Sequence, residues 1–227
     1  ALAAGEPVPR PVVVGPVTYL LLAKAADGAA PGFRPLDRLH DVLSAYGHLL
    51  ADLWAAGAEW VQLDEPALVC DAWDTPREDV LAAVADAYTW ISAITERPRV
   101  LVAGSYGSLG DALPVLASTG IEGLAIDLVA GELPDAADLV SRSDILILGV
   151  KPYVIPSVLT GLSEAIGRSK PLVVSIAAGL TLERLESMLP EGTRVVRTMP
   201  NMAAAVGESM TALAPGSSTG AHDLETV

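Results

Sequence analysis

Short apolar runs rich in β-branched residues alternate along this chain with longer segments of helical periodicity. This alternation is typical of βα units, in which helices connect parallel strands, and it predicts an α/β fold. The candidate strands are Pro11–Val17, Trp60–Asp64, Arg99–Ala103, Gly123–Leu128, Asp144–Val150, Pro171–Ile176, Arg194–Thr198 and Ser209–Leu213. The clearest candidate helices are Leu36–Ala56 and Arg77–Thr95.

The composition changes near Glu132–Pro134. All four Trp precede this point and all four Met follow it. The net charge also differs, at −11 for residues 1–133 and −3 for residues 134–227. We therefore expect two parts of different origin, residues 1–132 and residues 133–227.

The total charge and the cysteine content exclude several classes of function. A net charge of −14 argues against nucleic acid or an anionic membrane as a partner, because both need clustered Lys and Arg. Cys70 is the only cysteine, so we expect no intrachain disulfide and a cytoplasmic location. Apolar runs such as Ile145–Val150 are too short to cross a bilayer. The chain begins at Ala1 and ends in what looks like the start of a helix, His222–Val227, so both ends look cut from a longer protein.

Chemistry in βα folds gathers at the carboxyl ends of the strands. Two adjacent carboxylates, Asp64 and Glu65, leave one strand just before Pro66. They favour either turn formation and capping or a pair that binds an amine or orders a loop. The glycine-rich segment Gly104–Asp111 follows another strand, but its spacing fits neither a dinucleotide fingerprint nor a phosphate loop. We expect it to form a tight turn.

Strand ends in the second part carry small residues and a cation. The segment Gly149–Pro152 joins a glycine, which lets a ligand approach the backbone, to the positive charge of Lys151 and a proline that stops the strand. The segment Ile176–Gly179 is a small-residue turn, and Thr181 is the expected cap of the helix that follows. Taken singly these are packing residues or a solvated charge, and their joint pattern is more informative than any one of them.

The first part resembles the amino-terminal barrel domain of cobalamin-independent methionine synthase over residues 7–131. The stretches that carry the resemblance are Val14–Leu22, Gly57–Leu68, Gly107–Asp111 and Gly123–Val129. The resemblance implies about four units of an eight-unit barrel and a link to methyl transfer from a polyglutamylated folate to homocysteine. It makes Asp64 and Glu65 candidate substrate-binding residues.

In that family zinc is held by Cys, His and Glu in a separate carboxyl-terminal barrel. Cys70, His40, His48 and His222 give no zinc set with plausible spacing here, so we expect no metal site.

The second part, from about Pro134 to the end, resembles the second half of the nucleotide-binding domain of pyrroline-5-carboxylate reductase. The stretches that carry this resemblance are Ser143–Pro152, Pro171–Thr181, Arg197–Asn201 and Val206–Ala214. It implies a site for NADP(H) or NAD(H) formed by Gly149, Val150, Lys151, Pro152, Ile176, Ala177, Ala178 and Asn201. Gly149 stands where the family usually has alanine, and no Gly-x-Gly-x-x-Gly cradle for the pyrophosphate precedes these strands.

These observations predict a partial (βα)8 barrel joined to a partial Rossmann-like sheet. The leading hypothesis is a hybrid of two enzyme fragments with no complete active site and no catalytic residues, whose partners are small molecules at most. The alternatives are a residual NAD(P)H binder or weak reductase of proline biosynthesis, and a folate- or homocysteine-binding fragment of methionine biosynthesis. Because a half-sheet has open edges, strands from Asp144 onward are expected to pair with the first four or with another chain, and self-association through unpaired edges is expected.

Overall fold

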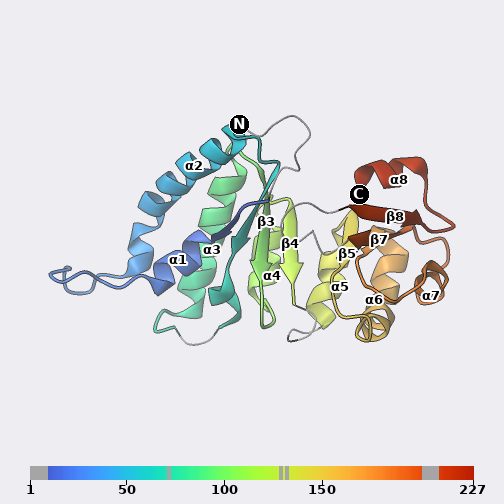
Figure 1. Cartoon of the computed structure of the whole chain (residues 1–227). Helices are drawn as coiled ribbons and strands as arrows, with labels where there is room; N and C mark the ends of the chain where they lie inside the picture. The colour runs from blue at the N-terminus through green and yellow to red at the C-terminus, as the bar shows by residue number, and fades with distance from the viewer. Residues whose placement is uncertain (1–9, 71–72, 128–129, 131–132, 201–209) are drawn as a thin grey trace. The chain divides into compact units, whose positions relative to one another are not determined.

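The computed structural model describes residues 10–70, 73–127, 130, 133–200 and 210–227. The chain divides into two compact units, Ala1–Gly131 and Glu132–Val227, and each contains its own four-stranded sheet (Figure 1). The predicted α/β class is confirmed. No helix in the described ranges is long and apolar enough to cross a membrane.

The first sheet is entirely parallel, and its strands follow chain order. The strands are β1 (Val12–Val14), β2 (Trp60–Asp64), β3 (Arg99–Gly104) and β4 (Gly123–Ile126). The helical segments are α1 (Pro16–Leu22), η1 (Pro35–Arg38), α2 (Leu39–Ala55), η2 (Pro66–Val69), α3 (Arg77–Ser92) and α4 (Ala112–Ala117). This order arises because each crossover helix places the next strand beside the previous one.

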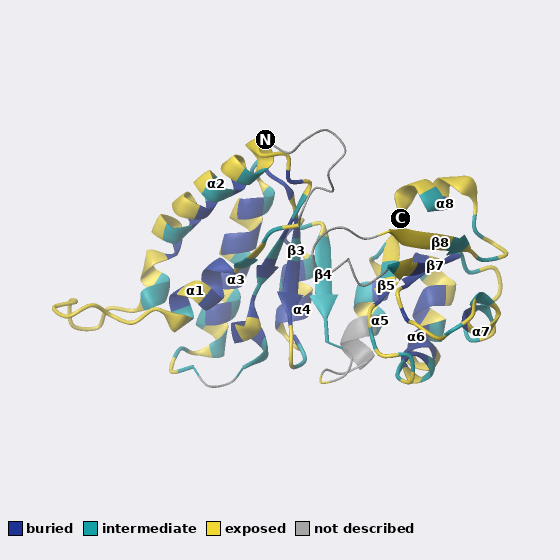
Figure 2. Ribbon diagram, viewed as in Figure 1, coloured by how far each residue is buried: buried dark blue, intermediate teal, exposed yellow. Residues whose placement is uncertain are grey.

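Helices cover one face of this sheet. Val61 and Leu63 of β2 are completely buried, as are Val100 and Val102 of β3, and α2, α3 and α4 pack side by side as a layer (Figure 2). Successive side chains of a strand point to opposite faces. The intervening residues of β2 accordingly lie on the other face and remain half-buried. The first unit is therefore a two-layer structure whose second sheet face is partly open and carries both polar and apolar side chains.

The second unit also alternates helices and strands. Its elements are α5 (Leu133–Ser141), β5 (Ile145–Leu148), α6 (Ile155–Ser169), β6 (Leu172–Ser175), α7 (Leu182–Glu186), β7 (Val195–Pro200), β8 (Thr211–Pro215) and α8 (Ala221–Thr226). The core strand β6 is buried along its whole length. The Thr181 side chain accepts a hydrogen bond from the Arg184 N–H at 3.2 Å, which confirms the predicted helix cap.

The structure corrects three expectations. The strand predicted at Pro11–Val17 ends at Val14, because Pro16 starts α1, where a proline ring suits the first turn of a helix. β8 runs antiparallel to β7, since the ten residues between them are too few for a parallel crossover. Among the described residues the strands from β5 onward form a sheet of their own, in which β5 pairs with β6, so the predicted pairing with the first four strands is not found there. Pairing with another chain stays a prediction, and Ile147 on β5 is 65% exposed.

Candidate functional site at the carboxyl edge of the first sheet

Asp64 and Glu65 lie at the carboxyl end of β2 and face opposite sides of the sheet. The residues of β2 alternate between half-buried and buried, and Asp64 ends the half-buried series. Glu65 continues the series of Val61 and Leu63 and is completely buried. The two carboxylates therefore do not form one binding pair.

The Glu65 carboxylate holds the start of α1 in place. Its Oε1 accepts hydrogen bonds from the Val17 N–H at 3.1 Å and from the Tyr88 hydroxyl at 2.7 Å, and its Oε2 accepts one from the Thr18 N–H at 2.7 Å. A carboxylate is favourable here because the first N–H groups of a helix have no partner within the helix. A Cβ on Gly15 would lie 2.2 Å from the Glu65 Cδ, so glycine is required for this approach.

Burial raises the pKa of Glu65, and the hydrogen bonds from Thr18, Tyr88 and Val17 oppose that rise. Burial and the nearby Glu65 raise the pKa of Tyr88 as well. This group of side chains joins β2, α1 and α3 in the interior. Its role in the structure is to fix the carboxyl edge of the sheet.

Asp64 keeps a solvent-accessible carboxylate on the helix-free face. Its Oδ1 accepts a hydrogen bond from the Gln62 Nε2 at 2.7 Å, and it pairs in register with Val14 and Ala103 on the neighbouring strands. Of the two predicted substrate-binding residues, Asp64 is thus the one that remains partly exposed to solvent.

A cavity of about 590 Å³ opens at the same edge, between η2, the start of α3 and the glycine-rich loop that follows β3. Its described lining residues are Leu68, Val69, Cys70, Trp73, Thr75, Arg77, Val80, Ser108, Leu109, Gly110 and Asp111. The loop packs closely on η2, because a Cβ on Gly107 would lie 3.0 Å from the Val69 Cβ. The glycines predicted to make a tight turn thus also shape one wall of the cavity.

An arginine and a carboxylate meet at the rim of this cavity. The Nε and Nη2 of Arg77 donate to the Oδ1 of Asp111 at 3.0 and 2.5 Å, and Nη2 also lies 3.5 Å from the Leu109 carbonyl oxygen. The hydrogen bonds from Arg77 lower the pKa of Asp111 despite some opposing burial. Both side chains are partly exposed, at 34% for Arg77 and 55% for Asp111.

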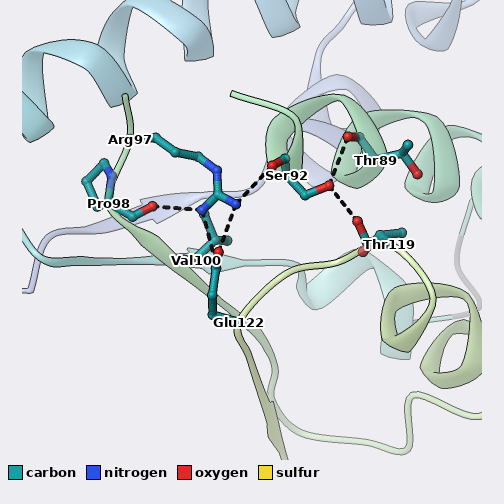
Figure 3. Close-up of polar contacts among 7 residues, drawn as sticks. All are labelled: Thr89, Ser92, Arg97, Pro98, Val100, Thr119 and Glu122. Carbon is teal, nitrogen blue, oxygen red and sulfur yellow. Dashed lines mark hydrogen bonds and ion pairs between the residues drawn. The ribbon is translucent and has the colours of Figure 1, made fainter. Parts of the chain in front are cut away.

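The opposite edge of the sheet also contains an arginine, Arg97, in a different setting (Figure 3). Its Nη1 and Nη2 donate to both carboxylate oxygens of Glu122 at 3.0 and 2.9 Å, and Nη1 also donates to the Pro98 carbonyl at 2.9 Å. Glu122 accepts a further hydrogen bond from the Val100 N–H at 2.8 Å. Although partial burial alone would raise the pKa of Glu122, the hydrogen bonds from Arg97 and Val100 lower it.

The predicted cofactor residues of the second unit lie in two neighbouring turns. Gly149, Val150, Lys151 and Pro152 follow β5, and Ile176, Ala177 and Ala178 follow β6. The Ile176 N–H donates to the Leu148 carbonyl at 3.3 Å, so the two turns start side by side. Gly149 and Lys151 are exposed, Ile176 is 45% exposed and Ala177 is buried. Asn201 lies outside the described residues.

Sequence reasoning did not identify the cavity at the first sheet. Its walls come from segments about forty residues apart in the chain, from Leu68 to Asp111. The available signals were the glycine-rich loop after β3 and a cation, Arg77, at the start of a helix. Within the described ranges no three His, Cys, Asp or Glu side chains are grouped to hold a metal ion.

Comparison with known proteins assigns this chain to a family. The family model described as "Cobalamin-independent synthase, N-terminal domain" matches residues 2–151. The chain belongs to this family. The match covers all four strands of the first sheet and continues through α5 and β5.

Curated relatives agree with that assignment. A 5-methyltetrahydropteroyltriglutamate–homocysteine methyltransferase of Rhodococcus jostii is 42% identical over 217 residues, which cover 87% of this chain and 28% of the relative. The corresponding Streptomyces avermitilis and Streptomyces coelicolor proteins are 58% and 59% identical over 122 and 118 residues, covering 54% and 52% of this chain and 15% of each relative. The chain thus spans less than a third of the length of these relatives.

Among solved structures, two pyrroline-5-carboxylate reductases are similar to this chain. The Streptococcus pyogenes enzyme is 25% identical with a TM-score of 0.40 and covers 64% of this chain and 49% of its own. The Coxiella burnetii enzyme is 20% identical with a TM-score of 0.42 and covers 74% and 53%.

Proposed function

We propose that the first unit is a ligand-binding fragment of the methionine synthase type. The observation that carries this proposal is the family match, combined with a cavity and an accessible carboxylate at the carboxyl edge of the matched sheet. The relatives act on homocysteine and 5-methyltetrahydropteroyltriglutamate, as their names state. Because the chain spans only 15 to 28% of these relatives, we propose binding without turnover by this chain alone.

Asp64 is the proposed contact for the amino group of homocysteine. Its carboxylate is accessible on the helix-free face, whereas both carboxylate oxygens of Glu65 accept hydrogen bonds from backbone N–H groups of α1. A carboxylate pairs with an ammonium group through a charge-assisted hydrogen bond, which is stronger than a neutral one. The sequence predicted that both carboxylates contact the substrate, whereas the proposal keeps Asp64 alone as the contact.

Calorimetry with homocysteine tests this proposal. We expect saturable heat from the unmodified chain and a flat titration from Asp64→Asn. Asp41→Asn is the matched control, because Asp41 is an exposed aspartate on α2, where it pairs with Arg38. Equal titrations of the unmodified chain and Asp64→Asn would reject Asp64 as the contact, and a flat titration of the unmodified chain would reject homocysteine binding.

We also propose that the chain is a hybrid whose second unit derives from a reductase-like fragment. Each unit has its own sheet, and the relatives aligned over about 120 residues have higher identities than the one aligned over 217. Two observations argue against a junction near Glu132–Pro134: the family match continues to residue 151, and the Rhodococcus jostii relative aligns over 217 residues, or 87% of this chain. Measurable turnover of pyrroline-5-carboxylate or of homocysteine by the isolated chain would contradict the proposal that this hybrid has no complete active site.

A second candidate function is residual binding of a nicotinamide cofactor by the second unit. It is favoured by the side-by-side turns after β5 and β6 and by the exposed Lys151, which could meet a phosphate. Titration of the chain with NADPH, followed by cofactor fluorescence, tests it. We expect a saturable change that Lys151→Ala weakens and Arg168→Ala leaves intact, since Arg168 lies in the last turn of α6 and pairs with Glu164. No saturable change at millimolar cofactor would reject this function.

A further inference from the structure

The cavity at the first sheet combines apolar walls with one charged corner. Leu68, Val80 and Leu109 lie behind the lining and are almost fully buried, so its accessible apolar surface comes from the half-buried Val69, Cys70 and Trp73. The indole N–H of Trp73 donates to the Ala67 carbonyl at 3.2 Å, which fixes the ring at the wall. Most small-molecule sites have this composition, with apolar walls and a few polar groups that orient the ligand.

Arg77 is the only cation among the described residues that line the cavity. Its Nε and Nη2 both donate to the same oxygen of Asp111, so the pair lacks the two parallel hydrogen bonds of an ideal arginine–carboxylate contact. These contacts are made by Nε and Nη2, whereas a guanidinium carries five N–H donors in all. The guanidinium therefore has donor capacity left for a second carboxylate.

The contact between Arg77 and Asp111 is also easy to exchange. Both side chains are partly exposed, and pairs of this kind contribute about 0–1 kcal/mol. A carboxylate attached to an apolar body gains burial against the half-buried Val69 and Trp73 in addition to the charge-assisted hydrogen bonds. Such a ligand can therefore compete with Asp111 for Arg77.

We propose that this cavity binds a small carboxylate with an aromatic or aliphatic body, and that Asp111 is an internal competitor for the ligand's place on Arg77. The body packs against Val69, Cys70 and Trp73, and the ligand carboxylate accepts hydrogen bonds from the Arg77 guanidinium. This inference rests on the proposed function in one respect, since it takes the carboxyl edge of the first sheet to be the ligand site. It adds the chemical class of the ligand and the residue that selects it.

Two probes of equal shape test the class of ligand. 2-Naphthoate carries a carboxylate and 2-naphthamide a neutral amide on the same ring system. We expect naphthoate to change the tryptophan fluorescence saturably and naphthamide to bind at least about tenfold more weakly, because a charge-assisted hydrogen bond contributes about 1.5–3 kcal/mol. Trp73→Phe should remove most of the fluorescence change, since the other three Trp do not line the cavity. Equal binding of the two probes, or no saturable binding of naphthoate, would overturn the proposal.

Two variants with opposite expected effects test the competition. Arg77→Gln should lose the preference for naphthoate over naphthamide, whereas Asp111→Asn should bind naphthoate several-fold more tightly, because it removes the competing charge. Arg38→Gln is the control for a lost arginine, since Arg38 pairs with Asp41 outside the cavity. Unchanged or weaker naphthoate binding by Asp111→Asn would contradict the competition even if Arg77→Gln failed to fold.

The homocysteine titration separates this inference from the proposed function. If homocysteine binds through Asp64 and naphthoate does not bind, the inference about the cavity fails alone. If naphthoate binds through Arg77 and homocysteine does not bind, the inference about the cavity is supported and the proposed contact at Asp64 is rejected.

Discussion

The two edges of the first sheet each hold an arginine–carboxylate pair, and the pairs differ in burial and geometry. At the amino edge Arg97 is 7% exposed and contacts both oxygens of Glu122 (Figure 3). At the carboxyl edge Arg77 contacts one oxygen of Asp111, and both side chains are partly exposed. Breaking a buried pair leaves an uncompensated charge, whereas an exposed pair contributes little. The same chemistry thus stabilises the fold at one edge and leaves a cation available for a ligand at the other.

The carboxyl edge also contains a structural carboxylate, Glu65, and its removal should have the largest effect. Glu65→Ala leaves the Val17 and Thr18 N–H groups and the Tyr88 hydroxyl without an acceptor. We expect a loss of about 4 kcal/mol in the free energy of unfolding. Urea denaturation followed by tryptophan fluorescence measures it, because all four Trp lie in the first unit.

Asp64→Ala is the matched control for Glu65→Ala. It removes the adjacent carboxylate on the open face and should change the stability by less than about 0.5 kcal/mol. A loss as large as that of Glu65→Ala would show that Asp64 is structural, and it would weaken the case for a ligand contact there.

Removing Arg97 and removing Arg77 should lower the free energy of unfolding by different amounts, and this difference should be smaller than the effect of Glu65→Ala. Arg97→Ala leaves Glu122 partly buried without its partner, and we expect a loss of about 3 kcal/mol in the same denaturation experiment. Arg77→Ala should cost less than about 1 kcal/mol. Equal losses would remove the contrast between the two edges.

The pH dependence of stability should depend on Glu122. Because its pKa is lowered in the folded state, its contribution is present above the ordinary value of 4.5 and is lost as the pH falls through the folded value. The stability advantage of the unmodified chain over Glu122→Gln should therefore shrink below pH 4.5. Glu65, whose pKa is raised, has the opposite sign, but it is present in both proteins and cancels. An advantage that stays constant from pH 6 to pH 3 would contradict this account.

Sequence reasoning predicted the elements better than the site. The strand Trp60–Asp64 was predicted to the residue, since its apolar run is bounded by Gly57 and Pro66. The strand at Pro11 was predicted too long, because an apolar residue such as Val17 is compatible with a strand and with a helix. Pro16 suits the first turn of α1, and Glu65 accepts hydrogen bonds from the first N–H groups of that helix. The neighbourhood of Arg77 and Asp111 depends on how η2 and the loop after β3 fold together, which no local pattern encodes.

The alternation of a strand separates Asp64 from Glu65, and the sequence alone left their roles open. Adjacent residues of a strand point to opposite faces. For this reason the geometry of a strand disfavours the interpretation that Asp64 and Glu65 bind the same amine. What the sequence lacked was which face the helices cover, and this follows from the burial of Val61 and Leu63.

The central claim is that the carboxyl edge of the first sheet binds ligands and the amino edge supports the fold. Measuring naphthoate affinity and unfolding free energy together for Asp111→Asn and Glu122→Gln tests it most directly. The account predicts tighter binding at unchanged stability for Asp111→Asn, and lower stability at unchanged affinity for Glu122→Gln. Affinity and stability falling together in both variants would contradict it.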